Sequence, residues 1–542
     1  MITLNKVYIF GHKKPDTDSV TSAISLAYLK RKQGIDAEAK VLGRLNNETK
    51  FALKYFNVEY PEYLNDVKTQ ISDINYNKIK INKKTSIKEC YEVFKKEKIS
   101  GAPVINDKNK LSGIITLNDI SSYFVDGDYI NLKTSYNNIL NVVNGEEVLR
   151  FDDEIEGNIL VASYRSTTFL NNVDLNNNTI LIVGDRHSIL EYAVNSSVKL
   201  IIIVGDGQMK DEHLEIAKAN KVNVIRTKMD TFHTSKIINL SNYIENIIIT
   251  KNPIKFDEND YLSDFIESSK QHKHTNYPIV DKKNNCLGFL RLVDINDKTK
   301  KKVILVDHNE IIQSVDGIEE ADILEVIDHH KLGALSTSYP INFRNMAVGS
   351  TNTIIHLIYE ENNFPIPKPI AGIMLSGIIS DTLLLKSPTT TLLDKNAVMR
   401  LSKIAGVDYE KYGIEMFKAG SSIKGKSLEE ILFSDFKVFK VGNIEAGIGQ
   451  IFTTDYSSLK IDINKFEELL NNTSKNNDYL VVCLFITDIM NNGSYILFND
   501  KAKTILMDSF NLSTLNQGDY FPNIVSRKKQ ILPPIIDTLE RK

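Results

Sequence analysis

Residues 7–19, which run VYIFGHKKPDTDS, contain the first signals of the fold. The first four residues predict a β-strand, because they are apolar and a glycine ends the run. After the polar loop, apolar residues recur at helical spacing, so we expect a helix with Asp18 or Ser19 as its N-cap. Residues 38–42 predict a second strand. This order of elements indicates an α/β fold with a parallel sheet.

The composition is that of a water-soluble protein of several domains. At ~150 residues per domain, 542 residues predict three or four domains. The formal net charge of −3 provides no positive field for nucleic acid or an anionic membrane. The apolar stretch 370–379 is shorter than the ~20 residues of a membrane span, and the N-terminus has no leader pattern. Three isolated cysteines exclude a CxxC zinc site. We therefore expect a cytoplasmic protein with no membrane or nucleic-acid partner.

One internal repeat occurs at an offset of 175 residues. Residues 103–105 (PVI) match 278–280 (PIV), and residues 113–119 (GIITLND) match 288–294 (GFLRLVD) without a gap. Each copy predicts a helix, a strand, a turn, and a second strand that leads into a short helix. Between the copies, three apolar runs predict further strands, and two of these runs end in Gly-Asp turns; the runs are 159–162, 179–183 and 199–204.

Acidic and histidine side chains follow the predicted strands of the α/β part. Three clusters come just after a strand, and they are His12-x3-Asp16-x-Asp18, Asp307-His308-Asn309 and Asp328-His329-His330. A fourth acidic residue, Asp381, follows the apolar run containing 378–379. In parallel sheets, ligands gather at the carboxyl ends of strands, so we expect these four loops to converge. A lone aspartate is more often a helix cap and a lone histidine a core residue, but that interpretation weakens when every loop carries the same residue types.

The ligand types favour two divalent transition metals. Two imidazoles and four carboxylates suit Mn²⁺ or Co²⁺ better than an ion that prefers only oxygen. Zn²⁺ remains an alternative, although it usually takes fewer and softer ligands. The four carboxylates offset the charge of two divalent ions, so an anionic substrate would need additional cations.

Three resemblances to known families rest on these motifs. The repeat resembles CBS modules, which associate in pairs and commonly bind adenine nucleotides. The segment between the copies resembles a DRTGG domain, with its signature altered to residues 185–189 (DRHSI). The motifs GHKKPDTDS, VDHNE, IDHH, IISDTLLLKSPT and SRKKQ together resemble a family II inorganic pyrophosphatase of the DHH phosphoesterase superfamily.

The resemblance implies an α/β protein whose parallel-sheet DHH catalytic domain is interrupted by a CBS–DRTGG–CBS insert and followed by a smaller α/β C-terminal lobe. The implied segments are the first part of the DHH domain (1–66), CBS module 1 (67–125), the DRTGG-like domain (126–246), CBS module 2 (247–303), the second part of the DHH domain (304–422) and the C-terminal substrate-binding domain (423–542).

The resemblance also implies roles for single residues. His12 and Asp16 would bind one metal, Asp18, His329 and Asp381 the other, and Asp307 would bridge the two. The residues expected to hold the substrate phosphates are His330, Lys437, Arg527 and Lys528, with Lys418 as the alternative to Lys437. Asp328 has no ligand role and would orient the neighbouring histidines.

The implied reaction is hydrolysis of pyrophosphate to two phosphates. Two metals ~3.5–4 Å apart can share one water and lower its pKa toward neutrality, which generates a bridging hydroxide. Mg²⁺ carried by the substrate and the basic residues would stabilise the leaving phosphate. Because the metals and the basic residues lie in different lobes, we expect the lobes to close, with a hinge near Gly420.

The insert implies regulation by adenine nucleotides. Asp119 and Asp294 would accept hydrogen bonds from ribose hydroxyls, and Thr116 would contact a phosphate. Arg291, at the position equivalent to Thr116, would pair with a phosphate or stack on adenine. Tyr277 would be either a second stacking face or a half-buried strand residue. By resemblance AMP and ADP would inhibit, ATP or diadenosine polyphosphates are candidate activators, and CBS pairing implies a homodimer or a higher even oligomer.

Two alternative functions are compatible with parts of the sequence. Another DHH-superfamily phosphodiesterase would cleave short oligonucleotides or cyclic dinucleotides, but such relatives usually carry a Gly-rich, His-containing C-terminal motif that this chain lacks. A catalytically inactive nucleotide sensor would lack a metal ligand, whereas all six are present here.

Overall fold

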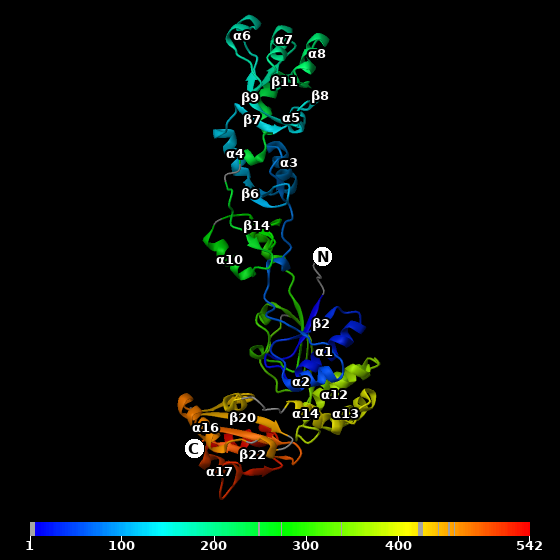
Figure 1. The fold of residues 1–542 in the computed structure, drawn as a ribbon, viewed down its shortest axis with the longest axis vertical. Helices are drawn as coiled ribbons and strands as arrows, with labels where there is room; N and C mark the ends of the chain where they lie inside the picture. The colour runs from blue at the N-terminus through cyan, green and yellow to red at the C-terminus, as the bar shows by residue number, and fades with distance from the viewer. Residues whose placement is uncertain are drawn as a thin grey trace. The chain divides into compact units, whose positions relative to one another are not determined.

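The computed structural model describes residues 6–247, 250–272, 274–337, 339–420, 427–442, 444–453, 456–459 and 461–541. The chain forms two compact units, one made of residues 1–69 and 300–542 and the other of residues 70–299 (Figure 1). The insert expected from the sequence was 67–303. The expected start of the C-terminal domain at 423 lies outside the described residues. In the described part of the chain, no helix has the length and apolar character needed to cross a membrane.

The first unit is built on a six-stranded sheet in the order β18-β17-β16-β1-β2-β3. Every neighbouring pair is parallel, and β1 lies at the centre because it pairs with β2 on one side and with β16 on the other. The strands are β1 (Val7–Phe10), β2 (Ala37–Val41), β3 (Glu62–Tyr63), β16 (Lys302–Val306), β17 (Asp322–Asp328) and β18 (Asn342–Asn345). The parallel α/β sheet expected from the sequence is therefore confirmed.

The helices of this unit share a large apolar core with the sheet. They are α1 (Thr17–Lys32), α2 (Asn47–Tyr55), α11 (Thr351–Glu361), α12 (Lys368–Thr382), α13 (Leu392–Ala405) and α14 (Tyr409–Gly420). α1 and α12 are in close contact along their lengths, and both are buried nearly all round. This packing brings the beginning of α1 next to the end of α12.

Two local predictions were wrong. The N-cap of α1 is Asp16, whose carboxylate accepts a hydrogen bond from the Ser19 amide at 2.9 Å; neither Asp18 nor Ser19 is the cap. Asp381 was expected in one of the four converging loops, but it lies inside α12, to which the apolar run before it also belongs. An apolar run of this length fits a buried helix as well as a buried strand, and the sequence pattern cannot distinguish them.

The C-terminal lobe is a five-stranded sheet in the order β19-β20-β21-β22-β23. Only β20 and β21 run parallel, and the other pairs are antiparallel. Its elements are α15 (Leu428–Leu432), β19 (Phe436–Val441), β20 (Ile444–Thr453), α16 (Ile463–Asn477), β21 (Val481–Asp488), β22 (Gly493–Phe498), α17 (Ala502–Phe510), β23 (Tyr520–Pro522) and α18 (Leu532–Glu540). Every described residue of β21 is buried, so this strand is the centre of the lobe.

The two copies of the repeat fold alike. The first contains β4 (Ile81–Asn82), α3 (Ile87–Glu97), β5 (Gly101–Ile105), β6 (Leu111–Thr116) and α4 (Leu117–Asp126). The second contains β13 (Phe256–Asp257), α10 (Leu262–Gln271), β14 (Tyr277–Val280), β15 (Cys286–Leu290) and a short 3₁₀ turn (Leu292–Asn296). Lys110 and Asn285 occupy equivalent positions and pair with each other, as expected for two modules related by an approximate twofold axis.

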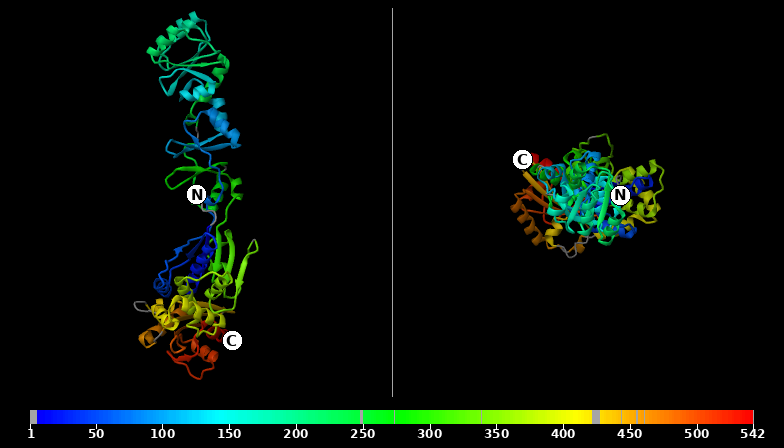
Figure 2. Two further views of the ribbon diagram at one scale, coloured as in Figure 1. Left: turned by 90° about the vertical axis from the view of Figure 1, so that its right-hand side faces the viewer. Right: turned by 90° about the horizontal axis from the view of Figure 1, so that it is seen from above.

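The segment between the copies forms a six-stranded sheet in the order β7-β9-β10-β11-β12-β8. Its strands are β7 (Asn131–Ser135), β8 (Gly145–Leu149), β9 (Glu154–Val161), β10 (Thr179–Val183), β11 (Leu200–Ile203) and β12 (Asn223–Thr227). The helices α6 (Ser166–Asn172), α7 (His187–Asn195) and α8 (Asp211–Ala219) lie together against one face (Figures 1 and 2). The other face is covered by α5 (Tyr136–Val143) and the 3₁₀ turn 238–241, next to α9 (Thr231–Ile237).

Candidate metal centre

The folded chain brings all six predicted metal ligands together. Three groups of side chains each offer ligand atoms within 4.8 Å of one another, and they are His12/Asp16/Asp307, Asp18/His329/Asp381 and Asp307/His329/His330. Asp307 belongs to two of these groups, and its side chain is 1% exposed. The first two groups correspond to the ligand sets that the resemblance implied for the two metals.

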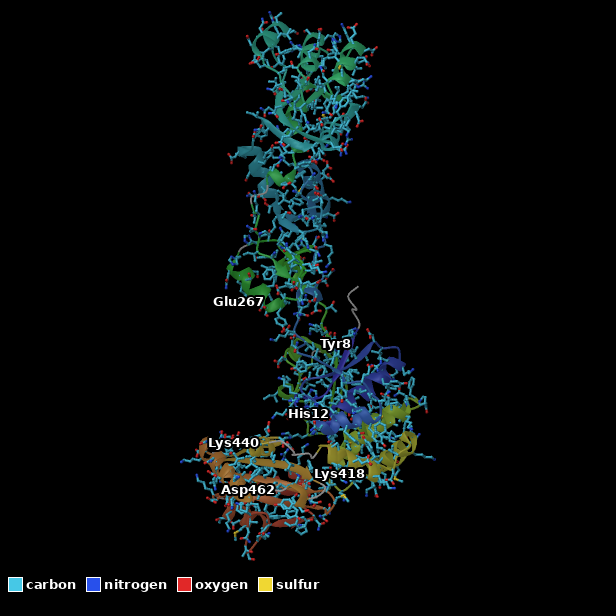
Figure 3. All side chains as sticks on the ribbon, viewed as in Figure 1. Tyr8, His12, Glu267, Lys418, Lys440 and Asp462 are labelled. Atoms are coloured by element: carbon cyan, nitrogen blue, oxygen red, sulfur yellow. The ribbon has the colours of Figure 1, made fainter. Side chains whose placement is uncertain are left out.

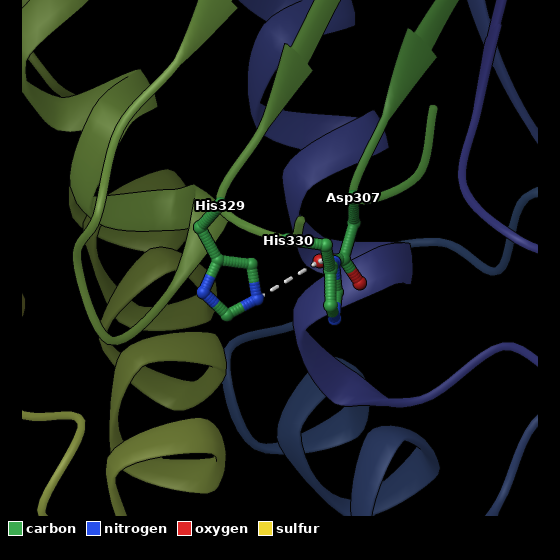
Figure 4. A group of neighbouring side chains, drawn as sticks. All are labelled: Asp307, His329 and His330. Carbon is green, nitrogen blue, oxygen red and sulfur yellow. Dashed lines mark ion pairs between the residues drawn. The ribbon is translucent and has the colours of Figure 1, made fainter. Parts of the chain in front are cut away.

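Asp307 presents one carboxylate oxygen to each set of ligands. Its Oδ2 lies 3.4 Å from His12 Nε2, and its Oδ1 lies 3.4 Å from His329 Nε2. Figure 4 shows Asp307 and His329 projecting toward each other from the ends of two adjacent strands. The Asp307 backbone is in the left-handed region, at φ 59°, which aspartate tolerates better than most residues. A carboxylate placed in this way can bridge two cations.

The histidines are oriented to act as metal ligands. His329 Nδ1 lies 3.1 Å from the Val348 carbonyl, which assigns a proton to Nδ1 and directs Nε2 toward the carboxylates. His329 Nε2 is buried without a hydrogen-bond partner and lies 3.3 Å from Asp381 Oδ2. A buried ring nitrogen that faces carboxylates at this distance needs a cation between them, either a proton or a metal ion, so these residues fit a divalent metal.

The electric field of the site also favours cations. Burial opposes a charge on His12, but Asp16 and Asp307 outweigh this and raise its pKa to about 11. Burial, with Asp307 and Asp381 nearby, raises the pKa of Asp18 well above its usual value. Protons therefore accumulate in this cluster, where bound metal ions would supply the missing positive charge.

Asp18 is held by the beginning of α11. Its Oδ1 accepts hydrogen bonds from the Ser350 hydroxyl at 2.5 Å and the Asn352 side-chain amide at 2.8 Å. Its Oδ2 accepts the Thr351 amide at 2.8 Å, and the Thr351 hydroxyl donates to Asp307 Oδ1 at 3.0 Å. The motifs in the sequence did not point to these three residues, although Ser-Thr-Asn before an apolar helix is a recognisable N-cap signal.

Asp328 has the contacts that an orienting role requires. Its Oδ1 accepts the backbone amides of His329 and His330 at 2.8 and 3.1 Å. The same oxygen lies 2.8 Å from His330 Nδ1. The buried carboxylate therefore fixes both histidines, and His330 is left half-exposed beside Asp307.

Arg527 is not free in this structure. Its Nη2 donates to both carboxylate oxygens of Asp435 at 2.8 and 2.9 Å, and its Nη1 donates to the carbonyls of Asp435 and Ile448. The guanidinium is buried. Only its Nε–H is left without such a contact among the described residues. The structure therefore gives Arg527 an anchoring role inside the C-terminal lobe, which the sequence did not predict.

Lys437 and Lys528 are exposed, and they are the more available cations of that lobe. The pKa of Lys437 is lowered by loss of hydration and by the charges of Arg527 and Lys528, while Asp435 and Asp16 act in the opposite direction. Its charge thus interacts with Asp16, a predicted metal ligand. The alternative, Lys418, lies on α14, where it is labelled in Figure 3.

The residues predicted to bind nucleotides fall into two kinds. The two aspartates are paired within their own turns. Asp119 accepts a hydrogen bond from the Thr116 hydroxyl at 2.6 Å, and Asp294 accepts one from Arg291 Nη2 at 2.7 Å. Tyr277 is fully buried against Phe256 and Phe265, and its hydroxyl donates to a backbone carbonyl. This position supports the alternative in which Tyr277 is a strand residue, because a buried ring has no free face for adenine.

Comparison with known proteins identifies the family. The chain is 34% identical to the cobalt-dependent inorganic pyrophosphatase of Clostridium perfringens over 541 residues, 98% of this chain and 97% of that one. It is 31% identical to the probable manganese-dependent inorganic pyrophosphatase of Thermotoga maritima over 557 residues, 100% of both chains. The manganese-dependent enzyme of Methanothrix thermoacetophila is 46% identical over 45% of this chain and 79% of its own. The chain belongs to the family II inorganic pyrophosphatases.

Family models match the domains of this family II pyrophosphatase in turn. They are the CBS domain at 71–126, the DRTGG domain at 138–241, the DHH family N-terminal domain at 237–378 and the DHHA2 domain at 414–538. The predicted family and its domain types are therefore confirmed.

Proposed function

We propose that this protein hydrolyses inorganic pyrophosphate to two phosphates, with Mn²⁺ or Co²⁺ as resident ions and Mg²⁺ arriving with the substrate. The observation that carries the proposal is the geometry of Asp307. One of its oxygens faces His12, next to Asp16, and the other faces His329, next to Asp18 and Asp381. The relatives' names, cobalt- and manganese-dependent pyrophosphatase, support the same reaction and the same metals.

When bound, two divalent ions lower the pKa of water between them and supply a nucleophile near neutral pH. The chain's own residues arrange this chemistry. Asp18 is fixed by the start of α11 and His329 by the Val348 carbonyl, so neither ligand needs to reorient. No serine, cysteine or other protein nucleophile is required.

The substrate side is provided by basic groups. His330, held by Asp328, is half-exposed at the rim of the centre, and Lys437 and Lys528 project from the C-terminal lobe. Four ligand carboxylates offset two divalent ions, so a pyrophosphate of charge about −3 needs these extra cations. Arg527 would keep Asp435 and the surrounding loop in place and reach a phosphate only through its Nε–H.

We further propose that the CBS pair binds adenine nucleotides and regulates the reaction, with AMP and ADP inhibiting and ATP or diadenosine polyphosphates activating. Asp119 and Asp294 would contact ribose, and Thr116 and Arg291 would contact phosphate. The CBS and DRTGG family models and the full-length relative that covers the insert support this assignment. The paired modules also support a homodimer or a higher even oligomer.

The decisive experiment measures phosphate release from pyrophosphate. The purified protein is stripped of metal and reloaded with Mn²⁺ or Co²⁺ in excess Mg²⁺, with and without AMP. We expect rapid turnover that AMP lowers. Turnover that no adenine nucleotide changes would remove the regulatory proposal, and no turnover with any metal would overturn the proposed reaction.

The matched variant is Asp307→Asn, which keeps the side-chain shape but removes the bridging charge. We expect a loss of turnover greater than the ~100-fold typical of residues that only support ligands, and weaker binding of both metals, because both ligand sets share this carboxylate. The control is Glu361→Gln, which changes an exposed ion pair with Arg344 on the same unit. An active Asp307→Asn protein with full metal content would overturn the assignment.

A further inference from the structure

Glu48 is a carboxylate next to the metal centre without being one of its ligands. It is the second residue of α2 and lies outside every group of predicted ligand atoms among the described residues. One oxygen, Oε1, accepts the Thr17 hydroxyl at 2.6 Å and the Ser380 hydroxyl at 2.5 Å. These two donors are 363 positions apart in the sequence, yet they meet on a single atom.

Both donors are covalent neighbours of metal ligands. Thr17 lies between Asp16 and Asp18 at the beginning of α1, and Ser380 precedes Asp381 near the end of α12. Three of the four ligand carboxylates are therefore carried by backbone segments that Glu48 connects. A shift of one segment by a fraction of an ångström would be transmitted to the ligand atoms, because each donor is only one peptide bond from a ligand.

The Glu48 side chain is itself confined. A Cβ at Gly420, the last residue of α14, would lie 2.9 Å from Glu48 Cβ and 3.2 Å from Oε2. The Thr17 hydroxyl also lies 3.1 Å from the Thr49 hydroxyl, so the hydroxyl that Glu48 accepts is held from a second direction. Glu48 is therefore packed closely against Gly420, and one of its two donors is held in place by Thr49.

We infer that Glu48 is a positioning residue: it holds the ligand-bearing ends of α1 and α12 at the separation that two divalent ions require. This inference rests on the proposed two-metal centre, but it concerns metal affinity and does not depend on which anion is hydrolysed. Side chains that orient metal ligands from behind typically change metal affinity ~10–100-fold when they are removed.

The test measures Mn²⁺ affinity by calorimetry and the visible absorption of the Co²⁺-loaded protein. Glu48→Ala should weaken metal binding at least tenfold and alter the Co²⁺ spectrum, whereas Glu48→Gln, which keeps the Oε1 acceptor, should remain within threefold of the wild type. The control is Asn46→Ala. It removes the N-cap of the same helix, whose Oδ1 accepts the Thr49 amide at 2.7 Å, without touching Thr17 or Ser380.

Equal losses in Glu48→Ala and Asn46→Ala would overturn the inference, because the effect would then come from the stability of α2. Unchanged affinity in Glu48→Ala, or a Glu48→Gln protein as weak as Glu48→Ala, would overturn it as well. If Glu48→Ala does not fold, Ser380→Ala removes one of the two bonds and should give a smaller loss of the same kind; unchanged affinity there would contradict the inference. A wild-type protein that binds two metals but does not hydrolyse pyrophosphate would refute the proposed reaction and leave this test intact.

Discussion

Single residues in this protein have roles that burial and partners determine more than residue type does. Arg527 and Lys528 are neighbours in one basic motif, yet the first is buried against Asp435 and the second is exposed. The motif SRKKQ indicated only that cations are present. Which of them is free to meet an anion depends on an acid 92 residues away in the sequence.

This difference predicts opposite results for two neighbouring substitutions. Arg527→Ala leaves the Asp435 carboxylate without its guanidinium donor and removes one donor each from the Asp435 and Ile448 carbonyls, so we expect a loss of about 1–3 kcal/mol in the free energy of unfolding. Lys528→Ala should leave unfolding unchanged and raise the KM for pyrophosphate several-fold. Thermal melts and steady-state kinetics distinguish the two. The control is Lys503→Ala, an exposed lysine of α17; a stable Arg527→Ala protein would contradict the anchoring role.

The protonation state of the predicted metal ligands implies a pH effect on metal binding. The carboxylates raise the pKa of His12 to about 11 and that of His329 well above its usual value, although burial opposes both charges. At pH 7 both rings are therefore doubly protonated, and a metal ion must displace one proton from each ring. The apparent affinity for Mn²⁺ should accordingly rise with pH. Calorimetry in two buffers of different ionisation enthalpy measures the released protons. Binding without proton release would contradict this charge state.

Among the elements, the turn after α12 is the most unusual. Leu383, Leu384 and Leu385 all have positive φ, at 49°, 57° and 65°, directly after the segment that carries Asp381. A left-handed backbone costs a residue with a Cβ roughly 1–2 kcal/mol. The burial of Leu383 and Leu384 in the main core offsets this cost. The following residue, Lys386, donates to the Ile489 carbonyl in the C-terminal lobe at 2.6 Å.

At this turn we expect glycine to be more stabilising than alanine, which is the reverse of their order inside a helix. At position 384 both alanine and glycine lose the side chain, but glycine alone relieves the left-handed strain, so Leu384→Gly should be more stable than Leu384→Ala by about 1 kcal/mol. The same pair at Leu375, inside α12, should show the opposite order by a similar amount. Chemical denaturation of the four variants measures both differences. An alanine variant that is the more stable at both positions would show that the turn changes its conformation.

The sequence predicted the elements whose signals are local and repeated. The strands that lead to His12 and Asp307 and the strand that ends at Asp328 are short and largely apolar, and the repeat identified two modules that fold alike. It could not place Asp381, because a buried helix and a buried strand show the same apolar run. The Arg527–Asp435 pair, the burial of Tyr277 and the position of Glu48 arise from contacts between distant segments, which no local pattern encodes.

At the scale of the molecule, two neighbouring chain segments connect the insert to the first unit. Thr69 and Lys300 are the last and first residues of that unit at the junction, and the Lys301 ammonium donates to the Lys68 carbonyl. The Thr69 amide donates to Glu320 at 2.9 Å. The chain therefore leaves and re-enters the catalytic unit at one place on its surface, as tolerated insertions do.

This junction predicts the result of removing the insert. When a short Gly-Ser linker replaces residues 70–299, both halves of the six-stranded sheet should still pair, because β1 and β16 lie in the retained segments. We expect pyrophosphate hydrolysis to persist and its response to AMP to disappear. Phosphate-release assays at several AMP concentrations check both parts. A shortened protein that still responds to AMP would place the nucleotide site outside the insert.

The central position of β1 has a consequence for how the protein is made. When residues 1–69 have left the ribosome, β1, β2 and β3 have been made but β16 has not. The edge of β1 that pairs with β16 therefore remains without its partner strand. The whole of 70–299 must then emerge, which takes roughly 10–50 s at the ~5–20 residues per second of synthesis. That segment is contiguous and has its own cores, so it can fold as it appears. During translation the regulator is complete before the enzyme that surrounds it in the sequence.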